Sequence, residues 1–211
     1  MPDLKNYQWL LLPFSLAALA LYLLYNRIIV LPYITQSLSD MGLIETAQSK
    51  AIQIIQASEG LSSKTAGVDK AYNFPSLLSD SASVYAYPDS TGIQTIGWGT
   101  IQYQNGNKVQ SGDCITKALA DDEFNYEFQQ KFNSIQQNAQ VTLTPGQLAA
   151  LTSFAYNEGL SALYSSTLWA LVNQSDFTNA ANEFDKWIYA GGQKINGLVN
   201  RRADEKALFL S

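Results

Sequence analysis

The start of the chain has a different hydrophobic pattern from the rest. Between Trp9 and Tyr25 there is no charged residue, and after the polar pair Asn26-Arg27 the apolar stretch resumes as far as Ile34. A helix of about 20 apolar residues crosses a bilayer, and the first run is at the short end of that range. No small-residue cleavage site follows it. An uncleaved signal anchor is therefore favoured over a cleaved signal peptide or a buried helix of a soluble protein.

The pattern divides the chain into three parts. We expect residues 1–34 to form a membrane segment, residues 35–42 a polar linker and residues 43–211 a folded domain. Apolar residues at helical spacing from Ile44 onward predict an amphipathic helix at the start of this domain. Gly60 suits the position just after a helix C-terminus, so this helix should stop there.

A small sheet is predicted after this helix. Residues 61–85 show poor periodicity and are interpreted as an inserted loop. Turn-forming residues follow at positions 89–92 and at Asn105-Gly106. Short runs typical of strands lie next to these turns, at Val84–Tyr87, at Thr95–Ile101 and around Val109.

The remainder of the chain has the spacing of helices. Thr116 is a candidate helix start, and Thr144-Pro145-Gly146-Gln147 combines an N-cap, a proline at the first helical position and a glutamine three residues after the cap. Gly159 should end that second helix. Further helices are expected at Ser166–Val172, Phe177–Ile188 and Leu198–Leu210. The predicted fold class is α+β, with a small antiparallel sheet lobe, a larger helical lobe and a cleft between them, preceded by the N-terminal apolar helix.

Composition excludes several function classes. The 211 residues carry a formal charge of −5, and binding to nucleic acid needs dense Lys and Arg. The chain has no histidine, which excludes Ser-His-Asp and Cys-His catalysis and the commonest zinc ligand. We expect no cofactor and no metal. The single cysteine, Cys114, has no activating base beside it and is interpreted as a small buried or half-buried residue rather than a nucleophile.

Carboxylates and hydroxyls remain as candidates for chemistry. Glu59 is expected in or just beyond the last turn of its helix, where the helix dipole disfavours the charged form, as a general acid near neutrality requires. Asp89 lies in a predicted turn and Thr95 in the strand that follows. Two carboxylates brought to one cleft from different elements are the minimum equipment for cutting a glycosidic bond. Each residue also has a structural interpretation: a solvated helix end for Glu59, a turn for Asp89 and β-propensity for Thr95.

Other conspicuous residues are assigned structural roles. The glycines near the candidate site are interpreted as backbone requirements, and they are Gly92, Gly97 and Gly99. The tryptophans interpreted mainly as core residues are Trp98, Trp169 and Trp187. The acidic residues interpreted as helix-end or solvated charges are Glu158 and Asp121-Asp122-Glu123.

The candidate site belongs to a longer ordered pattern that resembles the phage-type lysozymes, the muramidases that act as endolysins. The pattern extends over about residues 44–210. Its parts are Glu59-Gly60, Tyr87-x-Asp89-x-x-Gly92-x-x-Thr95-Ile96-Gly97-x-Gly99, Gly112-x-x-Ile115-Thr116, Leu143-Thr144-x-x-Gln147-x-x-Ala150-Leu151-x-Ser153-Phe154-Ala155-Tyr156-Asn157, Ser165-Ser166-Thr167-Leu168, Trp187-x-x-Ala190-Gly191-Gly192 and Gly197-Leu198-Val199-x-Arg201-Arg202-x-x-Glu205.

The resemblance implies hydrolysis of the β-1,4 bond between N-acetylmuramic acid and N-acetylglucosamine in the glycan strands of peptidoglycan. It implies that Glu59 is the general acid. It also implies that Asp89 and Thr95 place the attacking water or stabilise the oxocarbenium-like state, with inversion at the anomeric carbon. The family's glutamate faces a C-terminal arginine, for which Arg201 and Arg202 are both candidates.

Delivery to such a substrate is consistent with the N-terminal segment. We expect residues 9–31 to engage the bacterial inner membrane, with a monomeric catalytic domain in the periplasm. The segment would be a permanent anchor or a signal-arrest-release tether, as in some phage lysozymes. Two features depart from the family: the 61–85 insertion separates Glu59 from Asp89, and Thr100 stands where relatives often carry histidine. The alternatives are a lytic transglycosylase, which needs the acid but not the water-directing aspartate, and a non-catalytic peptidoglycan-binding or virion protein.

Overall fold

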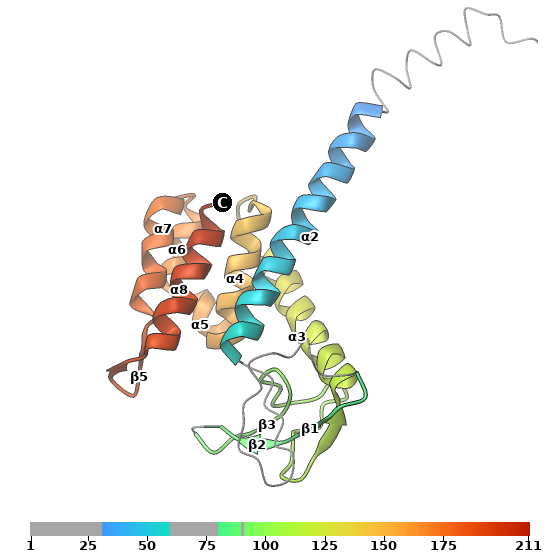
Figure 1. The fold of residues 1–211 in the computed structure, drawn as a ribbon. Helices are drawn as coiled ribbons and strands as arrows, with labels where there is room; N and C mark the ends of the chain where they lie inside the picture. The colour runs from blue at the N-terminus through green and yellow to red at the C-terminus, as the bar shows by residue number, and fades with distance from the viewer. Residues whose placement is uncertain (1–30, 60–79, 90) are drawn as a thin grey trace, which may run out of the picture. The chain divides into compact units, whose positions relative to one another are not determined.

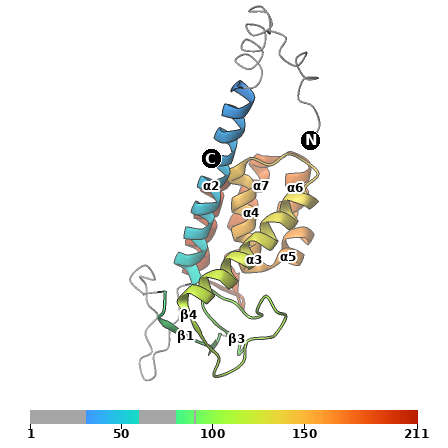
Figure 2. The same ribbon diagram turned by 90° about the vertical axis from the view of Figure 1, so that its right-hand side faces the viewer.

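The computed structural model describes residues 31–59, 80–89 and 91–211. Within this part, Glu45–Ser211 form one compact unit of helices and short strands (Figure 1, Figure 2). The membrane segment expected at 1–34 falls almost wholly outside the described residues, and so does most of the insertion expected at 61–85. Among the described helices, none is both long and apolar enough to span a membrane.

The first helix, α2, runs without a break over Leu31–Glu59. Residues 35–42, expected as a linker, are therefore helical. They are polar, but no proline interrupts them, and a single glycine such as Gly42 costs a helix only about 1 kcal/mol. The buried face in the second half of α2 follows the predicted amphipathic spacing and consists of Ala47, Ala51 and Ile55.

Among the described residues, three two-stranded antiparallel ribbons stand in place of the one hairpin sheet that the sequence suggested. The pairs are β1 (Ser83–Tyr85) with β4 (Cys114–Thr116), β2 (Tyr87–Pro88) with β3 (Gln94–Thr95), and β5 (Tyr189–Ala190) with β6 (Gln193–Lys194). The register of the second ribbon places Tyr87 opposite Thr95. Figure 1 shows the β1, β2 and β3 segments gathered below the helices.

The predicted strand at Thr95–Ile101 is interrupted by a tight turn. Ile96 and Thr100 bridge each other across Gly97 and Gly99, whose φ angles are +61° and +98°. A Cβ at Gly97 would lie 2.9 Å from Cβ of Ala120, in the helix that packs behind this turn. The prediction failed because close packing against that helix, which the local pattern does not record, bends the chain here.

The helices largely follow the predicted caps. The Thr116 side chain accepts a hydrogen bond from the Leu119 amide, and the box formed by Thr144 and Gln147 is complete. A short helix after Gly159 was not predicted, and the helix expected at Phe177–Ile188 ends early in a 3₁₀ turn. The elements are α3 (Lys117–Asn138), α4 (Pro145–Glu158), α5 (Leu160–Ser165), α6 (Thr167–Asn173), α7 (Phe177–Glu183), η4 (Phe184–Lys186) and α8 (Asn196–Phe209).

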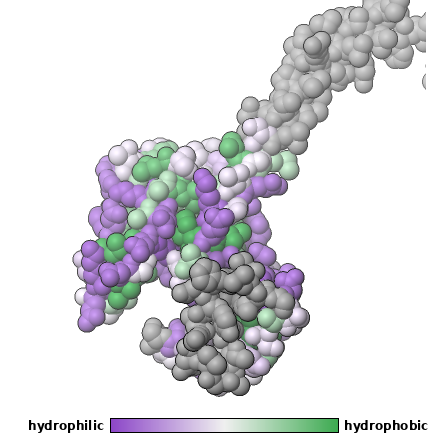
Figure 3. Space-filling model, in the orientation of Figure 1, coloured by the Kyte–Doolittle hydropathy of each residue, from purple (hydrophilic) through white to green (hydrophobic). Residues whose placement is uncertain are grey.

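Helix α4 is the centre of the helical core. Its residues from Gly146 to Ala155 are buried, and it packs against both α3 and α8. On one side the Phe154 ring meets the rings of Phe184 and Trp187 edge-on. In Figure 3 green hydrophobic patches lie among purple hydrophilic side chains on the visible face of the helical part. These α4 contacts fix α8, which carries the arginines of the candidate site, relative to the rest of the domain.

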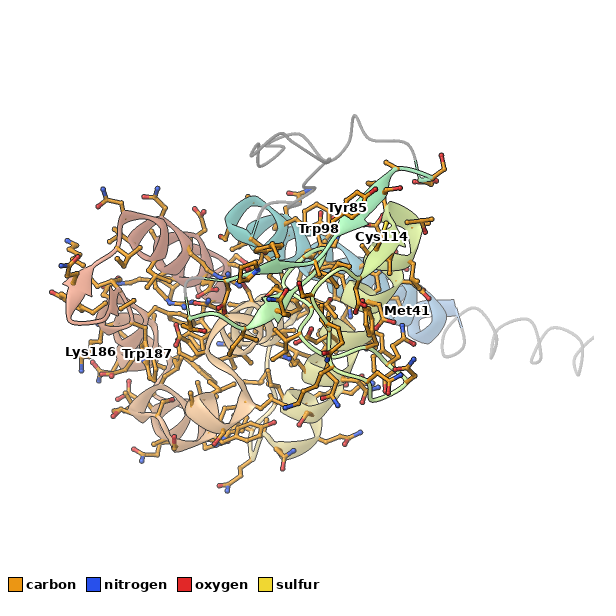
Figure 4. All side chains as sticks on the ribbon, turned by 90° about the horizontal axis from the view of Figure 1, so that it is seen from below. Met41, Tyr85, Trp98, Cys114, Lys186 and Trp187 are labelled. Carbon is orange, nitrogen blue, oxygen red and sulfur yellow. The ribbon has the colours of Figure 1, made fainter. Side chains whose placement is uncertain are left out.

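Trp98 and Trp169 are core residues as expected and Trp187 is half-buried, whereas two other residues differ from their assignments. Trp98, labelled among the strand segments in Figure 4, is 1% exposed and donates a hydrogen bond to Asp121. Glu123, expected to be solvated, is buried and accepts a hydrogen bond from the Gln104 amide. Cys114, also labelled in Figure 4, is exposed rather than buried, because in the two-residue period of β4 only Ile115 turns inward.

Candidate active site

Glu59 ends the described part of α2, and its carboxylate is held by the last helix of the chain. Oε1 of Glu59 accepts a hydrogen bond from Nη1 of Arg201 at 2.8 Å. The Arg201 side chain is 3% exposed and that of Glu59 is 26% exposed. The arginine is thus enclosed by protein, while part of the glutamate carboxyl remains open to solvent and to a ligand.

The second carboxyl oxygen of Glu59 faces the backbone of Gly99. A Cβ at this glycine would lie 3.3 Å from Oε2 and 3.6 Å from Cδ of Glu59. Its φ of +98° lies in the region that L-residues with a side chain rarely adopt. Gly99 therefore lets the chain that follows β3 pass directly beside the carboxyl, in agreement with the prediction of a backbone role.

Arg201 is itself fixed by a buried carboxylate. Its Nε donates to Oε1 of Glu205 at 3.2 Å, and its Nη2 donates to the carbonyl oxygen of Ser153 at 3.2 Å. The Ser153 hydroxyl donates to the same Oε1 of Glu205 at 2.7 Å. The Glu205 side chain is fully buried. These groups form a closed polar cluster between α4 and α8, directly behind Glu59.

Arg202 has a different set of partners. Its fully buried side chain pairs with Glu205, with the side-chain oxygen of Asn157 and with Glu158, the last at 2.7 Å, and it donates to the carbonyl oxygen of Trp187 at 3.1 Å. Successive residues of a helix point about 100° apart, so neighbouring arginines face different sides. Of the two arginines that the sequence offered as partners of Glu59, Arg201 is the one that contacts it in the structure. Glu158 is the last residue of α4, as expected of a helix-end charge, and it is ion-paired.

Asp89 lies in the turn between β2 and β3, as predicted, and its side chain organises that turn. Oδ1 accepts hydrogen bonds from the amide and the hydroxyl of Thr91, both at 2.8 Å, and from the amide of Ile93 at 2.9 Å. The hydroxyl of Thr91, followed by the Ile93 amide, holds the pKa of Asp89 below its ordinary value because these donors stabilise the charged form. Among the described residues all three bonds use Oδ1 and none uses Oδ2.

Tyr87 is affected by the charges of both carboxylates, Glu59 and Asp89. Burial raises the pKa of Tyr87, and the negative charges of Glu59 and then Asp89 raise it further, so the phenol lies within the field of both. Thr95, opposite Tyr87 in the ribbon, is 5% exposed, and its hydroxyl donates to the carbonyl oxygen of Ile93 at 3.1 Å. The ribbon thus holds Thr95 on β3 opposite Tyr87 and Asp89 in the turn that follows β2, while Glu59 lies at the end of the described part of α2.

A cavity of about 480 Å³ opens beside Glu59. Ala57 and Ser58 line it from α2, Asn157 from α4, and Asn200 and Arg201 from α8. Its lining combines polar and apolar groups in similar proportion and is shared by three helices, so a ligand in it would contact the glutamate directly. Among the described residues no group of Cys, Asp and Glu is arranged to hold a metal ion.

Sequence interpretation missed two residues of this site. Glu205 lies four positions after Arg201 and three after Arg202, the spacing at which helix side chains meet, so a pairing was detectable from the pattern. Ser153, by contrast, is 52 positions away from Glu205 along the chain. Its role depends on the packing of α4 against α8, and no local signal marks it.

A family model described as phage lysozyme matches residues 79–205, more than half of the chain. The chain belongs to the phage lysozyme family. The matched range contains Asp89, Thr95 and both arginines, whereas Glu59 precedes it. Membership confirms the resemblance drawn from the sequence.

Curated relatives from phages support the same assignment. An endolysin of Bacillus phage B103 is 41% identical over 117 residues, which cover 56% of this chain and 43% of that protein. An endolysin of Salmonella phage P22 is 37% identical over 126 residues, 60% of this chain and 86% of the relative. A SAR-endolysin of Escherichia phage Mu is 37% identical over 78 residues, 37% of this chain and 46% of the relative. The chain spans less than half the length of the Bacillus phage relatives it matches.

Solved structures of the phage lysozyme family share the fold. An endolysin from Escherichia coli O157:H7 phage FAHEc1 superposes with a TM-score of 0.60 at 28% identity, covering 77% of this chain and 91% of the other. A mutant of P22 lysozyme gives 0.58 at 31% identity, covering 77% and 97%. The predicted lysozyme-like α+β fold is therefore confirmed.

Proposed function

We propose that this protein is a muramidase of the endolysin type, which hydrolyses the β-1,4 bond between N-acetylmuramic acid and N-acetylglucosamine in peptidoglycan. The observation that carries the proposal is the pairing of Glu59 with the buried Arg201, on a carboxyl that stays partly exposed beside a cavity. The influence of both Glu59 and Asp89 on the pKa of Tyr87 supports a second carboxylate nearby. Two carboxyl groups of this kind, in a member of the phage lysozyme family, fit acid-assisted glycoside hydrolysis.

Glu59 has the geometry of a proton donor. Arg201 occupies Oε1, so the transferable proton would be on Oε2, the oxygen beside Gly99. From there it would pass to the glycosidic oxygen as the bond to the anomeric carbon breaks, and the leaving sugar would depart as an alcohol. General acid catalysis of this kind contributes roughly 10²–10⁴-fold to a rate.

Asp89 and Thr95 are suited to directing water. Oδ1 of Asp89 is occupied by its own turn, which leaves Oδ2 to accept a proton from a water molecule that attacks the anomeric carbon. The Thr95 hydroxyl donates to Ile93, so its oxygen can accept a hydrogen bond from that same water. Attack by water in place of a carboxylate gives inversion, with the two carboxyl groups separated by roughly 6.5–9.5 Å.

Digestion of purified cell walls tests this function against its alternatives. We expect full-length protein, purified in mild detergent, to clear a wall suspension and to release fragments with a reducing muramic acid end. Proton NMR of the first-formed product should show inverted anomeric configuration. Fragments with an anhydro-muramic end would establish a lytic transglycosylase. Binding to walls without release of fragments would establish the non-catalytic alternative.

We also propose that residues 9–31 carry the enzyme through the bacterial inner membrane and hold it there, with the domain on the periplasmic side. The apolar run in the sequence and the relative named SAR-endolysin support this proposal. Fractionation of cells before and after addition of an uncoupler separates the two forms of it. Full-length protein that moves to the soluble periplasm supports release, and protein that stays in membranes supports a permanent anchor. A domain protected from periplasmic protease throughout would reject delivery by this segment.

A further inference from the structure

The buried carboxylate of Glu205 has no direct contact with the space where a substrate would react. It is fully buried and contacts both arginines of α8 together with the Ser153 hydroxyl. A buried, unpaired charge is strongly disfavoured, and this one is fully partnered. The question is whether Glu205 only stabilises the fold or also acts on Glu59.

The contacts of Arg201 connect Glu205 to Glu59. The guanidinium uses Nε for Glu205, Nη2 for the Ser153 carbonyl and Nη1 for Glu59. The group is planar and rigid, so fixing two of its nitrogens fixes the position and direction of the third. The orientation of Nη1 toward Oε1 of Glu59 is thus set from behind, by groups that a substrate does not reach.

We propose that Glu205 is a positioning residue, which holds Arg201 against Glu59 and offsets part of the positive charge that the arginine presents to that carboxyl. This inference rests on the proposed role of Glu59 as the acid. An acid beside an uncompensated arginine would release its proton too readily, whereas an acid beside an arginine already shared with a second carboxylate keeps it to higher pH. Glu205 therefore contributes both geometry and charge balance.

Other titratable or charged groups also face Glu59 and could affect how its activity depends on pH. Arg201 and Asp204 face it from α8, and Asp204 lines the same cavity. Tyr156 of α4 and Tyr87 of β2 both lie in the field of Glu59. Burial raises the pKa of both phenols, so they stay neutral across the working range. Asp204 is the same in the wild type and in both variants compared below. Of these groups, Arg201 is the one that forms an ion pair with Glu59. Arg201 is also paired with Glu205, so a change at Glu205 alters the charge that Glu59 experiences.

The test compares full-length Glu205→Gln and Glu205→Asp with the wild type on a soluble peptidoglycan oligomer, with kcat and KM measured across pH. We expect Glu205→Gln to lower kcat by about ten- to hundredfold with little change in KM, because Arg201 is no longer held in place. The alkaline limb of its pH profile should also move to lower pH, since the local charge is more positive. Glu205→Asp keeps the charge, so it should lose turnover while its alkaline limb stays near that of the wild type.

Glu183→Gln is the matched control, since Glu183 is also buried but is paired with Lys186 near α7. An active wild type with Glu205→Gln behaving like Glu183→Gln would overturn the inference and leave the proposed function standing. A fall in turnover of Glu205→Gln without any shift of its alkaline limb would also overturn the inference and leave the proposed function standing. A wild type with no activity on walls would reject the proposed function itself. If Glu205→Gln fails to fold by circular dichroism, Glu205→Asp decides alone, and wild-type turnover in that variant would overturn the inference.

Discussion

Replacing Arg202 with methionine tests the energetic role of the buried charge cluster. The side chain is fully buried and pairs with Glu205 and Glu158, and its guanidinium carbon lies 4.7 Å from the centre of the Phe154 ring. Methionine retains an apolar stem of similar length that can pack on Phe154. The substitution therefore removes the charge and its hydrogen bonds with little loss of volume.

The buried partner dominates the expected cost. Removing one member of a buried ion pair costs about 3–5 kcal/mol, because the other charge is left without compensation. Glu205 is fully buried but keeps Arg201 and the Ser153 hydroxyl on Oε1, so only Oε2 loses its partner and the lower end of this range applies. The Glu158 side chain is 26% exposed, and a pair of that kind contributes at most about 1 kcal/mol. We expect Arg202→Met to destabilise the domain by about 3 kcal/mol, which is a large part of the roughly 5–15 kcal/mol typical of a domain.

Thermal unfolding of full-length protein, followed by circular dichroism, measures this effect. For a domain of this size a loss of 1 kcal/mol lowers Tm by about 2–4 °C, so the expected decrease is about 6–12 °C. Lys206→Met on the same helix is the control, because its pair with Asp185 is 27% and 59% exposed and should contribute below about 1 kcal/mol. Equal Tm values for the two variants would refute the reasoning that burial decides the cost.

Two further predictions concern the site. Gly99→Ala should lower turnover about tenfold, because the new Cβ would lie 3.3 Å from Oε2 of Glu59. Gly112→Ala is the control, because its φ of +92° causes the same kind of backbone strain while the new Cβ would meet open space. An equal loss of turnover in Gly112→Ala would exclude the contact with Glu59 as the cause. Thr91→Val should move the acid limb of the pH–rate profile to higher pH, because it removes a hydrogen bond that stabilises the charged carboxylate of Asp89 and lets the pKa of that group rise toward its ordinary value of 3.8. An unchanged acid limb would contradict the role of Asp89 as the group that must be charged.

Local signals in the sequence predicted most of the helices. Thr116 and Thr144 have side chains that satisfy free amides at a helix start, and both caps form in the structure. The linker prediction at 35–42 failed for a related reason. Polar composition alone does not end a helix, and no residue in that stretch forces the chain out of helical geometry.

The sequence pattern offered candidate residues for the site but did not predict how they are arranged. Asp89 was placed in a turn because aspartate accepts bonds from amides two residues on, and the structure has this turn. The pairing of Glu59 with Arg201 spans 142 positions, and two adjacent arginines offer the same chemistry to any sequence pattern. Only the angle at which α8 packs decides which of them faces Glu59. The same packing brings Ser153 to Glu205, so these contacts belong to the tertiary fold.

Glu59 as the proton donor is the central claim, and the rate of wall hydrolysis by Glu59→Gln tests it most directly. The amide has the shape of the carboxyl but no acidic proton, so full-length Glu59→Gln should clear purified walls roughly 10²–10⁴-fold more slowly than the wild type. Its circular dichroism should be unchanged. Glu45→Gln, an exposed glutamate on the same helix, should retain wild-type activity. Activity of Glu59→Gln close to that of Glu45→Gln would contradict the assignment and place the acid elsewhere.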